Sequence, residues 1–289
     1  MQGRALKSSI FFTFKKMGIM KEIVVISGKG GTGKTSITAS FAQLANDNVV
    51  VGDCDVDAAD LHLLLEPKVR TSETFQSGYI AKINPDVCTN CGKCALICRF
   101  DAIETIDFRY SVNEINCEGC AYCEKICPAH AIDMEENEVG EWFSSHTKFN
   151  SPMVHARMNV GAENSGKLVA KVKSEAKRIA EEFSKDFIII DGSPGVGCPV
   201  ISSLSGANYV ILVTEPSLSG IHDLKRVYEL VKKFQLNAGC IINKYDLNME
   251  AYQDIIEYLK LEEIDHLANI PYHENFTKAY YKWSNNYRI

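Results

Sequence analysis

The sequence lacks three features that would each place it in a particular class of protein. It has no apolar run that approaches the length of a membrane-spanning helix, so we expect no membrane partner. It has no excess of basic residues, and a net charge of −6 argues against a nucleic-acid partner. It has no secretory signal peptide ahead of its 11 cysteines, so we expect a cytoplasmic protein with reduced thiols.

The first 19 residues lack acidic side chains but contain four basic ones, Arg4, Lys7, Lys15 and Lys16. Transit peptides share this composition, yet basic and acid-poor leaders also arise by chance. We therefore interpret residues 1–19 as a poorly ordered N-terminal extension ahead of a core that starts near Met20.

A glycine-rich loop follows the first apolar segment of that core. KEIVVIS reads as a buried strand and SITASFAQLAN has helical character, and the loop between them matches G-x4-G-K-[ST], the pattern of a phosphate-binding loop. Its backbone N–H groups and the helix N-terminus attract phosphate, with Lys34 expected at the β- and γ-phosphates and Thr35 on Mg²⁺. The predicted nucleotide-binding residues here are Gly28, Lys29, Gly30, Gly31, Thr32, Gly33, Lys34, Thr35 and Ser36.

Two further apolar strands lead into acidic residues. FIIID ends in Asp191, which we expect close to Mg²⁺, and Gly195 follows it with a backbone N–H that can sense the γ-phosphate. NVVVGD ends in Asp53 and is followed by Asp55 and Asp57, and carboxylates at the C-terminal edge of a sheet can orient or deprotonate an attacking water. Turn and strand-end capping is the alternative role, and it is a stronger rival for Asp57 than for Asp55.

Four motifs together resemble those of the deviant-Walker ATPases of the MinD/Mrp type, distant relatives of the nitrogenase iron protein. The motifs are KGGTGKT, DCDVD, DGSPGVG and INKYD. The resemblance runs from Met20 almost to the end of the chain. It implies that the protein binds ATP with Mg²⁺, hydrolyses it, and forms a homodimer in which Lys29 reaches the phosphates held by the partner. It also implies that Asp55 is the catalytic switch aspartate and Asp191 the Walker B acid, so the predicted catalytic residues are Lys29, Lys34, Asp55 and Asp191.

The identity of the base is less clear from the sequence. Residues 243–246, NKYD, match the N-K-x-D pattern by which many GTPases hold guanine. The resembling family binds adenine near this asparagine instead, so we expect Asn243 to contact the base of ATP, with GTP as the alternative.

Eight cysteines form two runs of C-x2-C-x2-C-x3-C, and every member of the first run recurs 29 residues later. Three closely spaced thiolates can hold one face of a [4Fe–4S] cube, while the fourth ligand comes from the other run. The spacing predicts two [4Fe–4S] clusters and resembles a bacterial two-cluster ferredoxin. The first cluster is assigned to Cys88, Cys91, Cys94 and Cys127, and the second to Cys117, Cys120, Cys123 and Cys98.

Zinc is the alternative metal, but zinc sites usually show paired C-x2-C units separated by longer gaps. One residue departs from the ferredoxin pattern. Arg99 follows Cys98 at the position where Pro128 follows Cys127 in the second run. We interpret Arg99 as a cation that raises the reduction potential of the second cluster.

Strand-like runs alternate with helical stretches along the rest of the chain, which predicts an α/β fold with a doubly wound, mostly parallel sheet. The strand-like runs are 21–27, 48–53, 187–191, 208–214, 238–243 and 267–271. The resemblance implies a P-loop NTPase with an inserted α+β bacterial-type ferredoxin domain. We expect an ATPase domain in two parts, 20–78 and 139–289, with the ferredoxin domain at 79–138 between them.

Some positions are expected to be structural. An apolar stripe of helical period starts at Ser165, and the lysines on the other face of that helix are expected to be solvated. The stripe contains Leu168, Val172, Ala176, Ile179 and Phe183. We expect Cys54, Cys198 and Cys240 to be small buried hydrophobic residues.

These features favour an ATPase whose nucleotide cycle gates electron transfer through two [4Fe–4S] clusters to a redox partner or acceptor protein of unknown identity. An iron–sulfur cluster carrier or assembly ATPase is the alternative, although two fully ligated cubes argue against labile clusters. A membrane-cycling positioning ATPase is a third hypothesis, because residues 275–289 are basic and aromatic, but we interpret that tail as a packed final helix.

Overall fold

The computed structural model describes residues 20–159, 161–162 and 165–275, so the predicted extension at 1–19 and nearly all of the basic tail lie outside the described residues. In the described part of the chain, no helix combines the length and the apolar character that crossing a bilayer requires. The described chain forms two compact units. The first contains residues 20–73, 142–157 and 165–275, and the second contains 74–141 together with the described part of 158–164.

The first unit is built on a mostly parallel sheet, as the strand and helix alternation predicts. Nine strands lie in the order β11-β10-β9-β1-β8-β2-β7-β6-β3, and every pair from β11 to β7 is parallel. The strands that correspond to the six predicted runs are β1 (Lys21–Ile26), β2 (Val49–Asp53), β8 (Phe187–Asp191), β9 (Tyr209–Thr214), β10 (Ala238–Asn243) and β11 (Asp265–Ile270).

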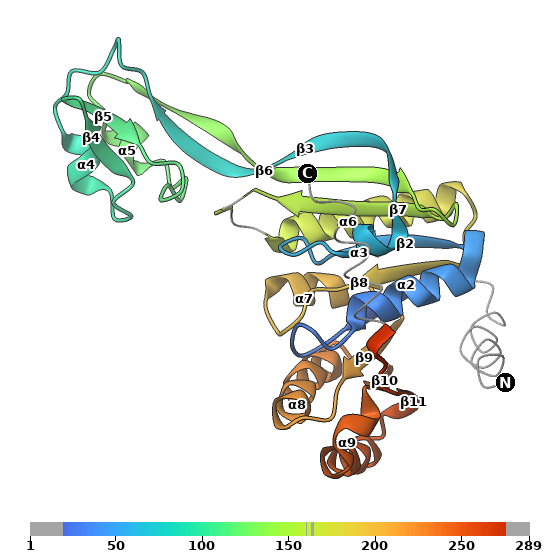
Figure 1. Cartoon of the computed structure of the whole chain (residues 1–289). Coiled ribbons are helices and arrows are strands. Elements are labelled where there is room, and N and C mark those ends of the chain that lie inside the picture. Colours follow the sequence, from blue (N-terminus) through green and yellow to red (C-terminus); the bar gives the residue numbers. More distant parts are fainter. Residues whose placement is uncertain (1–19, 160, 163–164, 276–289) are drawn as a thin grey trace. The chain divides into compact units, whose positions relative to one another are not determined.

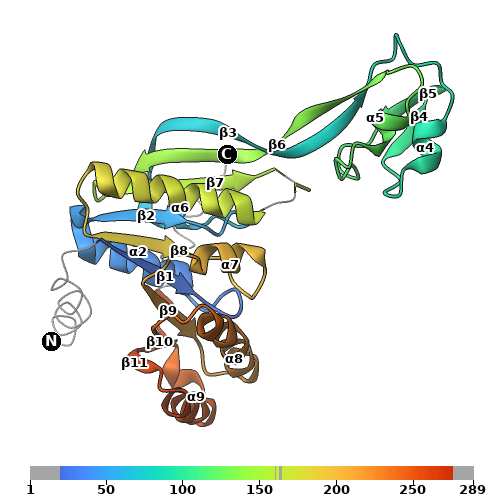
Figure 2. The same ribbon diagram turned by 180° about the vertical axis from the view of Figure 1, so that it is seen from behind.

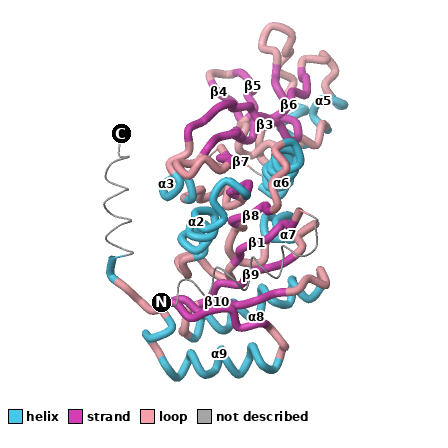
Figure 3. The backbone as a smooth tube through the Cα atoms, turned by 90° about the vertical axis from the view of Figure 1, so that its right-hand side faces the viewer, coloured by secondary structure: helices cyan, strands magenta, loops and turns pink. Residues whose placement is uncertain are grey.

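Helices cover both faces of this sheet, which makes it doubly wound. Figure 3 shows α2 (Lys34–Ala45) and α3 (Leu61–Leu65) on one side of the central strands, and α6 (Ser165–Glu182) and α7 (Cys198–Leu204) on the other. Figure 2 views the face that α6 and α7 cover. The remaining helices, α8 (Leu218–Lys233) and α9 (Met249–Leu261), pack near β9 and β11 (Figure 1).

The central strands are apolar on both faces because both faces are covered. In β1, Ile23 and Val25 belong to the core cluster that includes Ile37 and Phe41 of α2, while Val24 and Ile26 are equally buried. Each side chain removed from water contributes about 1.5–3 kcal/mol. Burial of this kind holds the C-terminal ends of β1, β2 and β8 in register, and these ends carry the loops of the candidate site.

Three strands at one edge of the sheet were not predicted from the sequence: β3 (Lys68–Ile83), β6 (Ile132–His146) and β7 (Pro152–Met158). The first half of β3 is an exposed edge with polar and charged side chains on both faces, so it lacks the apolar pattern by which a strand is recognised. Only five residues connect β6 to β7, and a parallel pair cannot be joined by so short a turn, so the two neighbours run antiparallel.

The second unit repeats itself internally. Two short helices, α4 (Lys93–Ile97) and α5 (Tyr122–Ile126), begin and end 29 residues apart, and each follows a residue in the left-handed conformation, Gly92 or Ala121. An antiparallel hairpin of β4 (Ile103–Ile106) and β5 (Arg109–Val112) lies between them in sequence. The strands β3 and β6 enter both units.

Three structural expectations need correction. Lys173, expected on the solvated face of α6, is buried, because α7 packs over that side of the helix. Its Nζ lies 2.7 Å from Glu22 Oε1 and donates to the carbonyl of Ser205 just after α7, at 2.6 Å, so it serves a helix end that leaves carbonyls unpaired. Phe183, expected in the apolar stripe, is exposed beyond the last residue of α6.

The third correction concerns the cysteines outside the two runs. Cys54 and Cys240 are buried, as expected. Cys198 is exposed, because it is the first residue of α7 rather than part of a strand.

Candidate functional site

The glycine loop connects the C-terminal end of β1 to the first residue of α2, Lys34. Two of its glycines are required by close packing. A Cβ at Gly28 would lie 2.3 Å from the backbone oxygen of Asp223 in α8, and a Cβ at Gly33 would lie 2.3 Å from Asn243 Nδ2. Gly33 also has a φ of 93°, a left-handed conformation that glycine adopts without strain. These contacts shape the loop ahead of the helix N-terminus.

Other parts of the loop are open. A Cβ at Gly30 or Gly31 would meet no described atom within 4 Å, so space is available above the loop. Thr32 is buried, and among the described residues its Oγ1 has no hydrogen-bond partner. Ser36 follows Thr35 in the first turn of α2. The open loop at a helix N-terminus can accommodate a phosphate chain.

Lys34 lies at the centre of a group of buried charges. It is 5% exposed, and its Nζ is 3.0 Å from Asp191 Oδ1, 3.4 Å from Asp55 Oδ2 and 3.5 Å from Thr35 Oγ1. Burial acts to lower the pKa of Lys34, but attraction to Asp191, Asp55 and Asp53 outweighs it and raises the pKa. Lys34 is therefore held as a cation, which is the state that binds phosphate.

The acids around Lys34 come from adjacent strands. Asp53 ends β2 and Asp191 ends β8, and the two residues are register partners. Burial, then repulsion by Asp191, raises the pKa of Asp53 well above its usual range. Burial also raises the pKa of Asp55, although the positive charge of Lys34 acts to lower it. Within the described residues, Asp53 Oδ2 and Asp191 Oδ2 are buried without a hydrogen-bond partner.

Unpaired carboxylate oxygens beside a threonine hydroxyl are the hard ligands that Mg²⁺ prefers, and Mg²⁺ needs one or two carboxylates when a phosphate supplies other ligands. Thr35, with Asp191 beside it, could hold the ion together with such a ligand. Sequence reasoning missed Thr38, whose Oγ1 donates to Asp191 Oδ1 at 2.9 Å. The sequence feature that could have indicated Thr38 is its position one helical turn after Lys34, on the same side of α2.

Lys29 makes its contacts within its own chain. Its Nζ lies 2.8 Å from Glu215 Oε1, 2.9 Å from Ser219 Oγ and 3.3 Å from Ser217 Oγ. Ser217 is the N-cap of α8. Glu215 precedes it and also accepts from Lys244 Nζ at 2.8 Å. Sequence reasoning missed Glu215, because nothing near it in the sequence indicates two lysine partners.

Gly195 lies in the loop after β8 with a φ of 90°. Its N–H, which the sequence places as a phosphate sensor, donates to the carbonyl of Ser27 at 2.9 Å. The neighbouring Ser193 Oγ donates to the carbonyl of Cys54 at 2.8 Å. The loop after β8 is therefore tied to the start of the phosphate loop and to the end of β2.

The NKYD segment, residues 243–246, contacts the phosphate loop. Asn243 Nδ2 donates to the carbonyl of Thr32 at 2.8 Å, and Lys244 Nζ donates to the carbonyl of Gly31 at 3.1 Å. Asp246 lies further along, and its Oδ1 accepts the backbone N–H of Tyr272 at 2.7 Å. Residues more than 200 positions apart in sequence thus meet at the loop.

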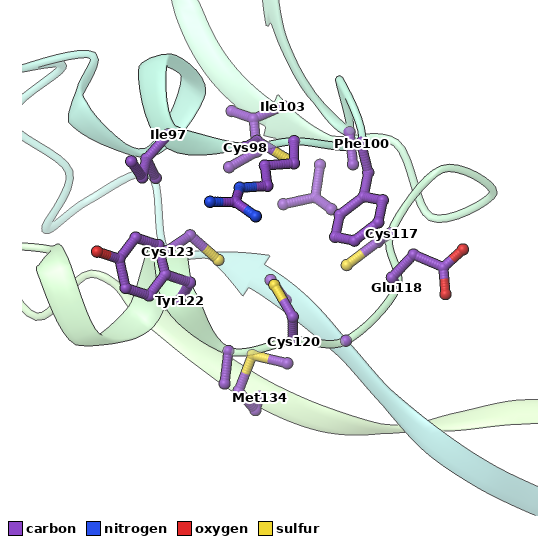
Figure 4. Close-up of a pocket in the computed structure, with 16 residues that line it drawn as sticks. Ile97, Cys98, Phe100, Ile103, Cys117, Glu118, Cys120, Tyr122, Cys123 and Met134 are labelled. Carbon is purple, nitrogen blue, oxygen red and sulfur yellow. The ribbon is translucent and has the colours of Figure 1, made fainter.

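The eight cysteines of the second unit line two pockets, four in each. One pocket is bordered by Cys88, Cys91, Cys94 and Cys127, and the other by Cys98, Cys117, Cys120 and Cys123. Figure 4 shows the second of these, with its four cysteines around the space that Ile97, Phe100 and Tyr122 border. Each pocket takes three thiols from one run and one from the other. Arg99 lines the pocket of Cys98, and Pro128 lines the pocket of Cys127.

Across the described residues, no three or more His, Cys, Asp or Glu side chains are grouped as a single metal ion would require. The four thiols of each pocket border one space.

Comparison with known proteins places this geometry in a family. The family model of the CobQ/CobB/MinD/ParA nucleotide binding domain matches residues 23–284. An uncharacterised protein of Methanocaldococcus jannaschii is 38% identical over 234 residues, which cover 80% of this chain and 81% of that protein. The chloroplastic septum site-determining protein minD homolog of Arabidopsis thaliana is 27% identical over 246 residues, 84% of this chain and 60% of that protein.

The fold is shared with solved structures. The septum site-determining protein MinD from Pyrococcus horikoshii, complexed with Mg-ADP, superposes with a TM-score of 0.52 at 21% identity and covers 92% of this chain and 86% of that chain. The cell division ATPase MinD of Pyrococcus furiosus superposes with a TM-score of 0.51 at 22% identity and covers 93% of this chain and 92% of that chain. With the family match across most of the sequence, a phosphate loop in the expected strand–helix setting and acids at the adjacent strand ends, the chain belongs to the MinD/ParA-type P-loop ATPases of the CobQ/CobB/MinD/ParA nucleotide binding domain family.

Proposed function

We propose that this protein is an ATP-hydrolysing homodimer whose nucleotide cycle gates electron transfer through two [4Fe–4S] clusters to a partner protein. The observation that carries the proposal is the division of eight cysteines into two crossed sets of four, in the same chain as the charged group around Lys34.

The nucleotide part of the proposal is supported by the contacts of Lys34. Lys34 would bind the β- and γ-phosphates, and Thr35, with Asp191 beside it, would hold Mg²⁺. Asp55, at 3.4 Å from Lys34 Nζ, is the carboxylate best placed to orient the attacking water. Gly195 would lose its bond to Ser27 when its N–H turns to the γ-phosphate, which would couple the loop after β8 to nucleotide state.

ATP is favoured over GTP. Guanine recognition by an N-K-x-D segment uses both oxygens of the aspartate, and Asp246 Oδ1 already accepts the backbone N–H of Tyr272. Asn243 remains next to the loop, where its side chain can turn to the base.

The homodimer is supported by the position of Lys29. A lysine that serves the phosphates of its own loop would lie beside Lys34, but Lys29 contacts the start of α8 instead. Release from Glu215 would free this cation to reach the phosphates of a second copy, where it would stabilise transferred charge as an arginine finger does.

The ferredoxin-like part is supported by the cysteine pockets. In a [4Fe–4S] cube each thiolate binds a different iron, and the cavity of about 530 Å³ among Cys98, Cys117, Cys120 and Cys123 has room for such a group, whereas the other set would open its space of about 20 Å³ to admit one. Cys88, Cys91, Cys94 and Cys127 would hold one cluster, and Cys98, Cys117, Cys120 and Cys123 the other. When bound, such clusters accept and release single electrons at low potential. The inserted domain would span 79–138 of the second unit.

Two measurements test the proposal. Anaerobically purified protein should contain about eight irons per chain, and about four or fewer would contradict the two clusters. The protein is then reduced, and electron delivery to an acceptor is followed with and without ATP. Wild type should respond to ATP and Lys34→Ala should not. Equal rates in both proteins would reject gating.

A cluster carrier or assembly ATPase is the second candidate. One thiol of each set, Cys91 and Cys120, is exposed, and an exposed ligand is where an acceptor could begin to take a cluster. Loss of iron to an apo-acceptor on addition of ATP would favour this candidate, whereas iron retained through many turnovers would favour electron transfer.

A further inference from the structure

The two cysteine pockets of the second unit have unequal surroundings. The cavity of Cys98, Cys117, Cys120 and Cys123 has a volume of about 530 Å³, and that of the other set about 20 Å³. Phe100 and Tyr122, on the border of the larger cavity, are 43% and 52% exposed (Figure 4). The larger cavity therefore opens to the surface through apolar walls.

Two apolar side chains of α4 are also exposed. Ile97 lines the cavity, and Leu96, its neighbour in the sequence, is 90% exposed. We call Leu96, Ile97, Phe100 and Tyr122 the α4–α5 patch. Burial of grouped apolar side chains against a partner lowers the free energy, because it removes them from water, and such groups with polar surroundings mark sites of protein association.

The charge of the second unit indicates what kind of protein fits the patch. Residues 74–141 contain 12 acidic and five basic side chains, whereas the rest of the chain is almost balanced. Arg99 and Glu118 both line the cavity, so the acidic excess belongs to the unit as a whole, with five of its acidic residues in 133–141. A unit with this excess of negative charge attracts basic surfaces and repels acidic ones.

We infer that the α4–α5 patch is the docking surface for the acceptor protein, and that this partner presents an apolar contact surrounded by basic residues. The inference rests on the proposed function, because it assumes that electrons leave through the second unit. It adds that they leave beside Cys98, Cys117, Cys120 and Cys123, and not beside the other set. One electron leaves this protein, the partner's acceptor centre gains it, and no bond is formed or broken.

Cytochrome c, a basic haem protein that accepts one electron, serves as the probe. Anaerobic holoprotein is titrated with oxidised cytochrome c by calorimetry at low salt, and the dissociation constant is compared between variants. Leu96→Gln combined with Phe100→Ser should weaken binding about tenfold. The matched control is Ile106→Gln combined with Phe108→Ser, which removes two exposed apolar side chains from the β4–β5 hairpin of the same unit and should change binding less than about twofold.

Electron transfer provides a second readout. Holoprotein reduced with dithionite and freed of excess reductant is mixed with cytochrome c or with ferricyanide. Leu96→Gln, whose side chain borders neither cysteine pocket, should slow reduction of cytochrome c and leave reduction of the small acceptor unchanged. Added salt should weaken the complex with cytochrome c, and acidic flavodoxin should bind more weakly than cytochrome c.

Each outcome is decisive for the docking surface. Equal weakening by the hairpin variant, or no weakening by the patch variant, would overturn it, and tighter binding of flavodoxin would overturn the basic partner. If the double variant loses iron, Leu96→Gln alone is used, because its side chain borders neither cysteine pocket. Wild type with few irons would refute the proposed function, whereas full iron content without a patch effect would refute the docking surface alone.

Discussion

Lys29 Nζ lies 2.8 Å from Glu215 Oε1 of the same chain, so the second lysine of the phosphate loop is paired away from the loop's own charged group. Glu215 holds Lys244 with its other oxygen, also at 2.8 Å. Attraction to both lysines offsets the effect of burial and lowers the pKa of Glu215. The carboxylate therefore remains ionised and keeps Lys29 in place until another anion competes for it.

Replacement of Lys29 should separate nucleotide binding from hydrolysis. Lys29→Ala should bind ATP within a few-fold of wild type but hydrolyse it about a thousand-fold more slowly, because the cation proposed to act in trans is lost. Lys34→Ala should lose binding itself. Phosphate release and binding of a fluorescent ATP analogue measure the two effects. Lys244→Ala is the matched control, since it removes the other cation from Glu215, and an equal loss of hydrolysis in that variant would contradict a special role for Lys29.

Exchange of Arg99 should shift one reduction potential. Arg99 lines the pocket of Cys98, and its counterpart in the other run, Pro128, lines the pocket of Cys127. A nearby cation stabilises the more negative reduced state, so Arg99→Pro should lower the potential of one cluster, and Pro128→Arg should raise that of the other. Redox titration followed by electron paramagnetic resonance measures both. Unchanged potentials in either variant, with iron retained, would remove the role of Arg99.

The buried pair of Lys173 and Glu22 should be a strong determinant of stability. Burial raises the pKa of Glu22, and the charge of Lys173 opposes this. Lys173→Met leaves the carboxylate buried without its partner and should destabilise the protein by about 3 kcal/mol, while added Glu22→Gln should restore part of the loss. Lys177→Met, on an exposed position of the same helix, should cost less than about 0.5 kcal/mol. Denaturant unfolding followed by circular dichroism measures these differences, and a double variant no more stable than Lys173→Met would disprove the pairing argument.

His155 should make the protein less stable in acid. Its Nε2 lies 2.9 Å from Ser145 Oγ, its ring stacks on Phe143, and burial together with His62 lowers its pKa from 6.5 to about 4. The unfolded chain therefore takes up this proton first, and the stability from neutral His155 is lost as pH falls from about 6.5 to about 4.

A variant isolates this contribution from that of other groups, since the raised pKa values of Asp53 and Asp55 act in the opposite direction. Between pH 7 and pH 4, wild type should lose about 2–3 kcal/mol more stability than His155→Gln. The exposed His130 is the control, and His130→Gln should follow the wild-type curve. Parallel curves for wild type and His155→Gln would show that His155 is not held neutral by the fold.

Prediction from the sequence succeeded where a strand is buried on both faces. The segments that form β1, β8 and β9 are uninterrupted apolar runs, because each lies between two layers of helices. It failed for β3, whose exposed edge position places no apolar requirement on alternate residues. It also misjudged Lys173, since helical period alone does not show that α7 covers that side of α6.

The sequence by itself determined the two kinds of binding group, because each depends on backbone geometry over a short stretch. The glycines that precede Lys34 let successive backbone N–H groups point into one concavity, and thiols in the C-x2-C-x2-C-x3-C spacing lie within reach of one group. The fourth cysteine of each pocket also followed from the sequence, because the repeat of the two runs indicates that they exchange one ligand. The tertiary structure alone decided which distant groups join the phosphate loop: Glu215 with Lys29 and Thr38 with Asp191. These contacts follow from the packing of parallel strands and helices, and long-range packing of that kind leaves no local signal in a single sequence.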